Sequence, residues 1–264
     1  MKILAIIGSP RVKGNTYKAV EEIRSELAGL DEDLNFDYLF LKDYHLTLCT
    51  GCFTCFSRGE DKCPLKDDLQ AIKDKMNEAE GIILAAPTYA LGVPALMKNF
   101  IDRMAYSSHR PYFFDKVFLA VTTTGGVMGM KQTLYQLAML AAGGRLAAKL
   151  GLSWPPIPMK GFEKRTRRSI QRATRLFYRQ LGQRIRKTPG LADWFYFHAF
   201  KAFTDTKPYQ KACPADFDYY KEKNEYFYPL AGHPFRRLLG KMARGMMHLS
   251  IGKMVKEPES SEGL

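Results

Sequence analysis

Residues 2–16 read KILAIIGSPRVKGNT, and this stretch decides what fold to expect. Its first seven residues are a continuous apolar run ending in glycine, which is typical of a strand buried on both faces of a parallel sheet. Small and polar residues follow. The apolar spacing after them predicts a helix over 16–28, with Asn15 or Thr16 as its cap. A strand, a loop and a helix in this order form the first half of a βαβ unit.

The same alternation continues through the first 158 residues. Further strands are predicted at 34–41, 81–86, 116–124 and 149–154, and further helices at 67–79, 94–106 and 131–142. Strands that alternate with helices at this spacing indicate an α/β fold with a parallel sheet. Five strands fit a doubly wound, flavodoxin-like sheet of order 2-1-3-4-5, in which ligands bind at the carboxyl ends of the strands.

Three loops at those strand ends have the chemistry of a binding site. The first leads small residues into a helix N-terminus, which suits an anion such as phosphate, although an ordinary turn is the alternative. Its polar groups are Ser9, Arg11, Asn15 and Thr16. The loops at 87–94 and 122–126 leave backbone and hydroxyl groups exposed, as a flat heteroaromatic ring requires. Together the loops fit a phosphate and a ring about as far apart as in flavin mononucleotide.

The densest chemical feature is CTGCFTC at 49–55, followed by Cys63 and a proline. Four of the five cysteines of the chain fall within these fifteen residues. Thiolates spaced C-x2-C-x2-C suit an iron–sulfur cluster best and zinc second. A set of thiols without metal is the third possibility. The isolated Cys213 is expected to be structural.

The motifs GSPRVKGNT, CTGCFTCFSRGEDKCPLKDDL and AAPTYALGVPALMKNFIDR resemble the flavodoxin-like NAD(P)H-dependent FMN reductases, and more narrowly the iron–sulfur flavoproteins of anaerobes. The resemblance covers roughly residues 1–155. It implies a protein that binds FMN non-covalently and transfers electrons, usually as a homodimer or homotetramer. NAD(P)H or a ferredoxin would be the electron donor.

Carried over residue by residue, the resemblance implies three groups of site residues. The phosphate of FMN would bind at Ser9, Arg11, Asn15 and Thr16. The isoalloxazine would lie among Pro87, Thr88, Tyr89, Gly92, Thr123, Thr124, Gly125 and Gly126. A [4Fe–4S] cluster would be held by Cys49, Cys52, Cys55 and Cys63. Electron transfer requires no side chain as acid or base, so no catalytic residue is assigned.

The chain is expected to divide after residue 158. Residues 1–158 form the predicted FMN-binding domain, with a cysteine-loop insertion at 45–66, and residues 159–264 form a basic, aromatic-rich, largely helical C-terminal extension. Of the net charge of +13, residues 160–190 contribute +10, because they hold 11 Lys and Arg against one Glu. Residues 160–187 are predicted to form an Arg-rich helix with a narrow apolar stripe. This helix could bind nucleic acid, anionic lipid or an acidic redox partner. The alternative is that it packs on the flavin domain or across a dimer interface with its charges in water.

Beyond that helix, residues 191–228 are interpreted as irregular and residues 234–255 as a second basic amphipathic stretch. No run is long and apolar enough to predict a membrane-spanning helix, and the N-terminal run lacks a small-residue cleavage site. A cytoplasmic protein is therefore expected, in which clustered cysteines favour metal or redox chemistry. Asp67 and Asp68 are expected to cap a helix and not to form an acid–base pair.

The predicted function is that of an FMN-dependent oxidoreductase that passes electrons between FMN and a [4Fe–4S] cluster. A cluster-free NAD(P)H-dependent FMN or quinone reductase is the alternative of the same class. The alternative of another class is a flavodoxin-like scaffold with structural zinc that binds nucleic acid or a membrane surface. For the predicted flavoprotein no nucleic acid is expected as a partner, and any peripheral membrane contact would use the basic C-terminal helices.

Overall fold

The computed structural model describes residues 1–155, 157, 160–183, 189–230 and 245. Its first part alternates strands and helices as follows: β1 (Lys2–Ile7), α1 (Asn15–Ala28), β2 (Asn35–Phe40), α3 (Leu69–Glu78), β3 (Gly81–Pro87), α4 (Ala95–Arg103), β4 (Val117–Thr124), α5 (Met130–Met139), β5 (Arg145–Ser153) and α6 (Phe162–Leu181). Between β2 and α3 lie the short helices η1 (Leu41–Asp43), α2 (Thr54–Ser57) and η2 (Glu60–Lys62), and η3 (Ala105–Ser108) follows α4.

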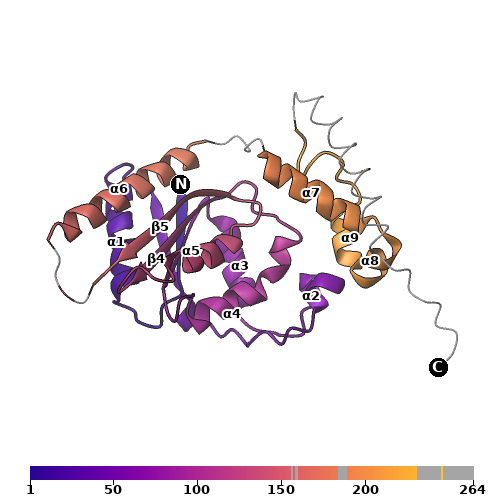
Figure 1. The fold of residues 1–264 in the computed structure, drawn as a ribbon, viewed down its shortest axis with the longest axis horizontal. Coiled ribbons are helices and arrows are strands. Elements are labelled where there is room, and N and C mark those ends of the chain that lie inside the picture. The colour runs from indigo at the N-terminus through magenta and orange to yellow at the C-terminus, as the bar shows by residue number, and fades with distance from the viewer. Residues whose placement is uncertain (156, 158–159, 184–188, 231–244, 246–264) are drawn as a thin grey trace. The chain divides into compact units, whose positions relative to one another are not determined.

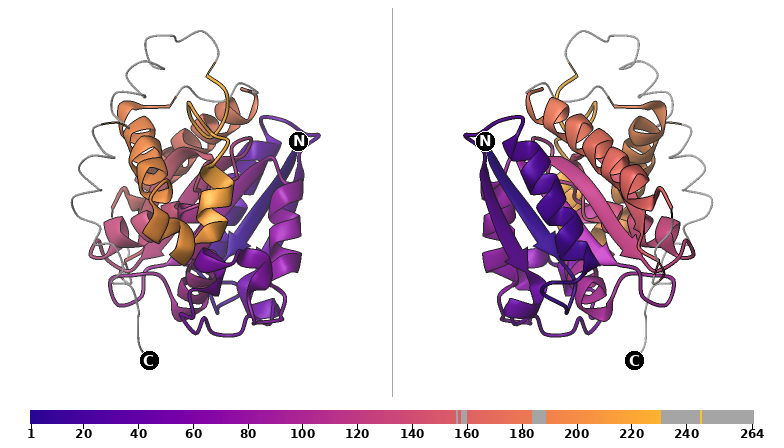
Figure 2. Two further views of the ribbon diagram at one scale, coloured as in Figure 1. Left: turned by 90° about the vertical axis from the view of Figure 1, so that its right-hand side faces the viewer. Right: turned by 90° about the vertical axis from the view of Figure 1, so that its left-hand side faces the viewer.

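The five strands are parallel and lie in the order β2-β1-β3-β4-β5, so the predicted fold class is confirmed (Figure 1). The helices cover both faces of this sheet. α1 and α6 lie over one face, as the right-hand view of Figure 2 shows, and α3 and α5 pack on the other. Every residue of β3 is buried for this reason, and its sequence is uniformly apolar instead of alternating.

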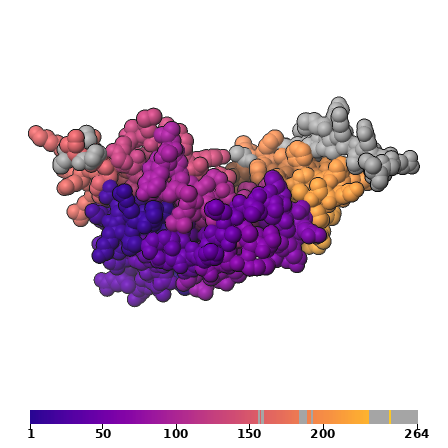
Figure 3. Space-filling view, turned by 90° about the horizontal axis from the view of Figure 1, so that it is seen from below, coloured from indigo at the N-terminus to yellow at the C-terminus, as the bar shows by residue number. Residues whose placement is uncertain are grey.

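The core between α1, α6 and the sheet explains the place of the basic helix. Ile170, Ala173 and Phe177 of α6 are buried in one apolar cluster with Val20 and Ile23 of α1. The charged side chains of α6 lie on its opposite, exposed face. Of the two arrangements in the alternative interpretation, α6 therefore adopts the one in which the helix packs on the sheet domain with its charges in water. β1 pairs with β3 although the two strands are far apart in the sequence, so indigo and purple segments of the chain lie side by side on this sheet domain (Figure 3).

Several predicted boundaries differ from those observed. β5 begins at Arg145 and not at Lys149, and α1 has Gly14 at its N-cap instead of Asn15 or Thr16. The segment 191–228 is not irregular, because it contains α7 (Leu191–Thr204), α8 (Lys207–Ala212) and α9 (Pro214–Tyr220). Aromatic residues on all sides of α7 hide the helical period. Phe197 packs against Tyr220, with ring centroids 5.8 Å apart.

The chain separates into two compact units. The first comprises residues 1–50 and 65–186, and the second comprises 51–64 and 187–264. The predicted boundary at 158/159 does not coincide with this division, since α6 belongs to the sheet domain and part of the cysteine loop does not. The predicted amphipathic stretch at 234–255 lies outside the described residues, apart from Gly245. Among the helices that are described, none is long and apolar enough to cross a membrane.

Candidate functional site

The carboxyl ends of β1, β3 and β4 lie next to one another because these strands are neighbours in the sheet. Beyond the last pairing of β1 with β3, the Gly8 backbone N–H donates to the Ala85 carbonyl at 2.8 Å. The Thr88 N–H likewise donates to the Thr123 carbonyl at 2.8 Å. The fold therefore brings the three predicted ligand loops to one edge, where a single ligand could contact all of them.

The first loop leaves the N-terminus of α1 open to an anion. No side chain caps this helix, and its first turn contains no acidic residue, so its first amides keep their positive partial charge. Arg11 and Asn15 are exposed beside it. Ser9 is 3% exposed, and its hydroxyl accepts a hydrogen bond from the Arg11 N–H at 3.2 Å. Thr16 is buried, and its hydroxyl oxygen lies 2.7 Å from that of Thr123, which joins the first loop to the third.

The second loop makes a tight turn at Tyr89–Gly92, closed by two backbone hydrogen bonds of 2.8 and 3.0 Å. Its central residues, Ala90 and Leu91, have φ values of 45° and 67°. A two-residue turn with both φ values positive normally uses asparagine and glycine, so this one is strained. Sequence reasoning missed it because alanine and leucine do not indicate such a turn.

Helix α5 and the residue before it hold this strained turn in place. The Val93 N–H donates to Oε1 of Gln136 at 2.9 Å. Gly129, which has a φ of 76°, lies so close to the turn that a Cβ added to it would be 2.5 Å from the Cα of Leu91. Three threonine hydroxyls also connect the loop to its neighbours, since Thr88 Oγ1 lies 3.0 Å from both Thr122 Oγ1 and Thr133 Oγ1.

Replacing Gly129 with alanine is expected to destabilise the protein and to weaken binding of FMN, the ligand that the sequence predicts for this loop. A left-handed alanine costs about 1–2 kcal/mol, and the overpacking against Leu91 adds about 1–3 kcal/mol. Urea unfolding and FMN titration would measure both effects. Gly182→Ala is the matched control, because Gly182 has a helical backbone, and among the described residues an added Cβ there would meet just the Arg179 carbonyl oxygen, at 3.8 Å. Equal stability of the two variants would contradict the packing argument.

The predicted ring-binding residues differ in exposure. Pro87 and Thr123 are buried, Thr88, Gly92 and Thr124 are half-buried, and Tyr89, Gly125 and Gly126 are exposed. An added Cβ at Gly125 or Gly126 would meet no atom of the described residues within 4 Å, so open space adjoins the third loop in that part of the structure. All eight lie on the second and third loops at one sheet edge, and their roles in binding stay predictions.

The four cysteines of the loop at 49–63 differ in exposure. Cys49 and Cys52 are exposed, and Cys55 and Cys63 are half-buried. Across the described part of the chain, no three His, Cys, Asp or Glu side chains are grouped so that they could hold a metal ion. The backbone nevertheless bends sharply between the first three cysteines, because Gly51 and Phe53 both have positive φ, of 66° and 58°. Four cysteines at this spacing fit an iron–sulfur cluster in donor type.

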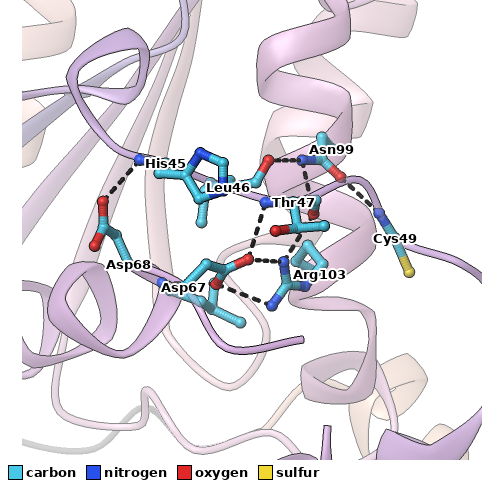
Figure 4. Close-up of polar contacts among 9 residues, drawn as sticks. His45, Leu46, Thr47, Cys49, Asp67, Asp68, Asn99 and Arg103 are labelled. Atoms are coloured by element: carbon cyan, nitrogen blue, oxygen red, sulfur yellow. Dashed lines mark hydrogen bonds and ion pairs between the residues drawn. The ribbon is translucent and has the colours of Figure 1, made fainter. Parts of the chain in front are cut away.

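Residues on α4 and before α3 hold the two ends of the cysteine loop (Figure 4). Arg103 forms an ion pair with Asp67, and their side chains are 2% and 0% exposed. Both Asp67 carboxylate oxygens accept further backbone N–H bonds, from Thr47 at 2.9 Å and Leu69 at 3.2 Å. Asp68 accepts from the His45 N–H at 2.7 Å and makes no side-chain cap on α3. Asp68 is the N-cap residue of α3, as predicted, but its side chain makes no capping hydrogen bond, and the N–H of the first residue of α3 donates to Asp67 instead.

Burial alone would raise the pKa of Asp67, but the hydrogen bonds from Arg103 and from the Thr47 and Leu69 amides outweigh it and lower the pKa below its usual value. Asp67 is therefore ionised at neutral pH. Sequence reasoning missed its partner, because nothing local connects residue 67 with residue 103. The only available signal was the spacing of Asn99 and Arg103, which places both on one face of a helix.

Comparison with known proteins finds similar sequences over most of the chain. The family model described as NADPH-dependent FMN reductase matches residues 1–150. An iron-sulfur flavoprotein of Archaeoglobus fulgidus is 29% identical over 224 residues, which covers 84% of this chain and 99% of the relative. An iron-sulfur flavoprotein of Clostridioides difficile is 30% identical over 208 residues, covering 76% of this chain and 88% of the relative.

Among solved structures, a flavone reductase superposes with a TM-score of 0.52 at 18% sequence identity. The superposition covers 71% of this chain and 66% of the other. At this level of identity the likeness concerns the fold.

Proposed function

Because the chain belongs to the NADPH-dependent FMN reductase family and is an FMN-dependent oxidoreductase, we propose that it is also an electron-transfer protein whose cysteine loop holds a [4Fe–4S] cluster. The observation that carries the proposal is the cysteine loop itself. Its four cysteines lie within fifteen residues, and its backbone turns at Gly51 and Phe53. The relatives named iron-sulfur flavoproteins, aligned over most of their length, support it.

The FMN phosphate would bind at the first loop. The uncapped amides of α1, the buried Ser9 hydroxyl and the exposed Arg11 offer donors and positive charge there. The contact between Thr16 and Thr123 keeps this loop next to the third one.

The isoalloxazine would lie against the second and third loops. The turn at Tyr89–Gly92 would present its outer surface to the ring, and Gly125 and Gly126 leave room for its face. Cys49, Cys52, Cys55 and Cys63 would hold the cluster as thiolates. When bound, FMN can carry one or two electrons and the cluster one, which allows two-electron donors to be matched with one-electron acceptors.

The test is an absorbance spectrum of the full chain, purified without oxygen, together with measurements of FMN, iron and acid-labile sulfide. We expect one FMN and about four iron atoms per chain, the composition of a [4Fe–4S] cluster with four cysteine ligands. FMN without iron or sulfide would reject the cluster and favour the cluster-free reductase. Zinc in place of iron, without flavin absorbance, would favour the scaffold that binds nucleic acid or a membrane surface.

A further inference from the structure

We propose that Asp67, Asn99 and Arg103 form a clamp that fixes both ends of the cysteine loop on α4, and that Asn99 is a positioning residue for the metal centre. The role in metal binding rests on the function proposed above. The clamp itself rests on contacts within the first compact unit, which contains all three residues and Cys49.

The clamp first joins the segment that enters the loop to the segment that leaves it. The Asp68 N–H donates to the His45 carbonyl at 3.1 Å, and the His45 N–H donates to the Asp68 carboxylate at 2.7 Å. The Thr47 N–H donates to Asp67 at 2.9 Å. These bonds span about twenty residues of sequence, so they close the base of the loop that carries all four cysteines.

The clamp then attaches this base to a rigid helix. Met97, Phe100 and Ile101 of α4 are buried, which fixes the position of the helix. From the same helix, Arg103 donates to the Thr47 carbonyl at 2.8 Å as well as to Asp67. An arginine that bridges a carboxylate and a carbonyl in a buried site fixes their relative positions closely.

The last contact of the clamp is to the first cysteine. Asn99 is 8% exposed, and its Oδ1 accepts the Cys49 N–H at 3.0 Å. Its Nδ2 donates to the Leu46 and Thr47 carbonyls at 3.1 and 3.3 Å. The side-chain amide of Asn99 thus both donates and accepts, and the hydrogen bond that it accepts comes from the backbone of a predicted metal ligand. Groups that orient ligands from outside the ligand set commonly control metal affinity.

A functional clamp and a merely structural one differ in what they control. A structural clamp would affect the stability of the sheet domain and FMN binding together. A positioning clamp would affect the cysteine thiols while FMN stays bound, because side-chain hydrogen bonds of Asn99 join it to Leu46, Thr47 and Cys49 of the cysteine loop.

The test compares Asn99→Ala with Lys98→Ala in the full chain. Lys98 is the matched control, since it lies next to Asn99 on α4 but is exposed and pairs with Asp102 at the surface. In protein purified without oxygen, an iron chelator should remove iron about 10- to 100-fold faster from Asn99→Ala than from the wild type. The Lys98→Ala variant should match the wild type, and all three should hold the same amount of FMN.

A second measurement uses the metal-free protein and does not depend on the cluster. Alkylation by iodoacetamide, followed by mass spectrometry, should be faster at Cys49 in Asn99→Ala, with the rate at Cys213 unchanged as the internal reference. Unchanged Cys49 alkylation would overturn the clamp, as would loss of FMN in parallel with iron. If the wild type contains no iron, the proposed cluster fails, and the alkylation rates alone decide the clamp. Asn99→Ser repeats both measurements should Asn99→Ala fail to fold.

Discussion

The double variant Cys52→Ser/Cys55→Ser is expected to contain no iron or sulfide and to keep its FMN. The two residues are half of the proposed ligand set, and a serine hydroxyl is not an adequate ligand for iron–sulfur clusters, which thiolates hold. FMN should remain because both cysteines belong to the second compact unit, whereas the three predicted flavin loops belong to the first. Iron, sulfide and FMN analysis of protein purified without oxygen would measure the effect.

The control for this variant is Cys213→Ser. Cys213 is the one cysteine outside the loop and precedes α9, so its exchange should leave iron unchanged. Iron at the wild-type level in the double variant would show that the centre is held elsewhere. A loss of FMN together with iron would mean that the cysteine segment also supports the flavin site.

Replacing Arg103 with methionine is expected to lower the free energy of unfolding by about 3–5 kcal/mol, because it leaves a buried carboxylate without its partner. The side chain of Asp67 is 0% exposed, so water cannot replace the guanidinium. Urea denaturation at neutral pH would measure the cost. The double variant Arg103→Met/Asp67→Asn should recover part of the lost stability, since an asparagine carries no charge and still accepts a backbone hydrogen bond.

The pH dependence gives this prediction an independent check. The pKa of Asp67 is lower in the folded protein than in the unfolded chain. Its ion pair therefore contributes fully to stability above the unfolded value of about 3.9, and the contribution is lost as the pH falls through the lower folded pKa. The difference in stability between the wild type and Arg103→Met should shrink over that acidic range. A difference that stays constant down to the lowest pH would show that the charge of Asp67 is not its cause.

Much of the fold and part of the site could be predicted because they depend on local patterns. The buried run at 2–8 and its counterparts at 81–86 and 116–124 identified the central strands, and chain order with right-handed connections then determined which loops meet. The contact between Thr16 and Thr123 follows from that topology. The division of the chain into two compact units was harder to predict. The apolar stripe of α6 indicates that the helix packs against another surface, but it does not indicate which surface. Homo-oligomerisation, membrane contact and cytoplasmic location stay predictions.

The sequence by itself determined the parallel sheet, the sheet edge at which the ligand loops meet, and the thiol chemistry of the loop at 49–63. Only the tertiary structure decided that Asn99 holds the backbone of Cys49, that Arg103 neutralises Asp67, and that Gly129 supports the turn at Tyr89–Gly92. The physical reason is the range of each interaction. Apolar periodicity and residue type act within one element, and they can be recognised along the chain. A buried hydrogen bond or ion pair depends on which elements the folded core brings together, and no local pattern specifies it.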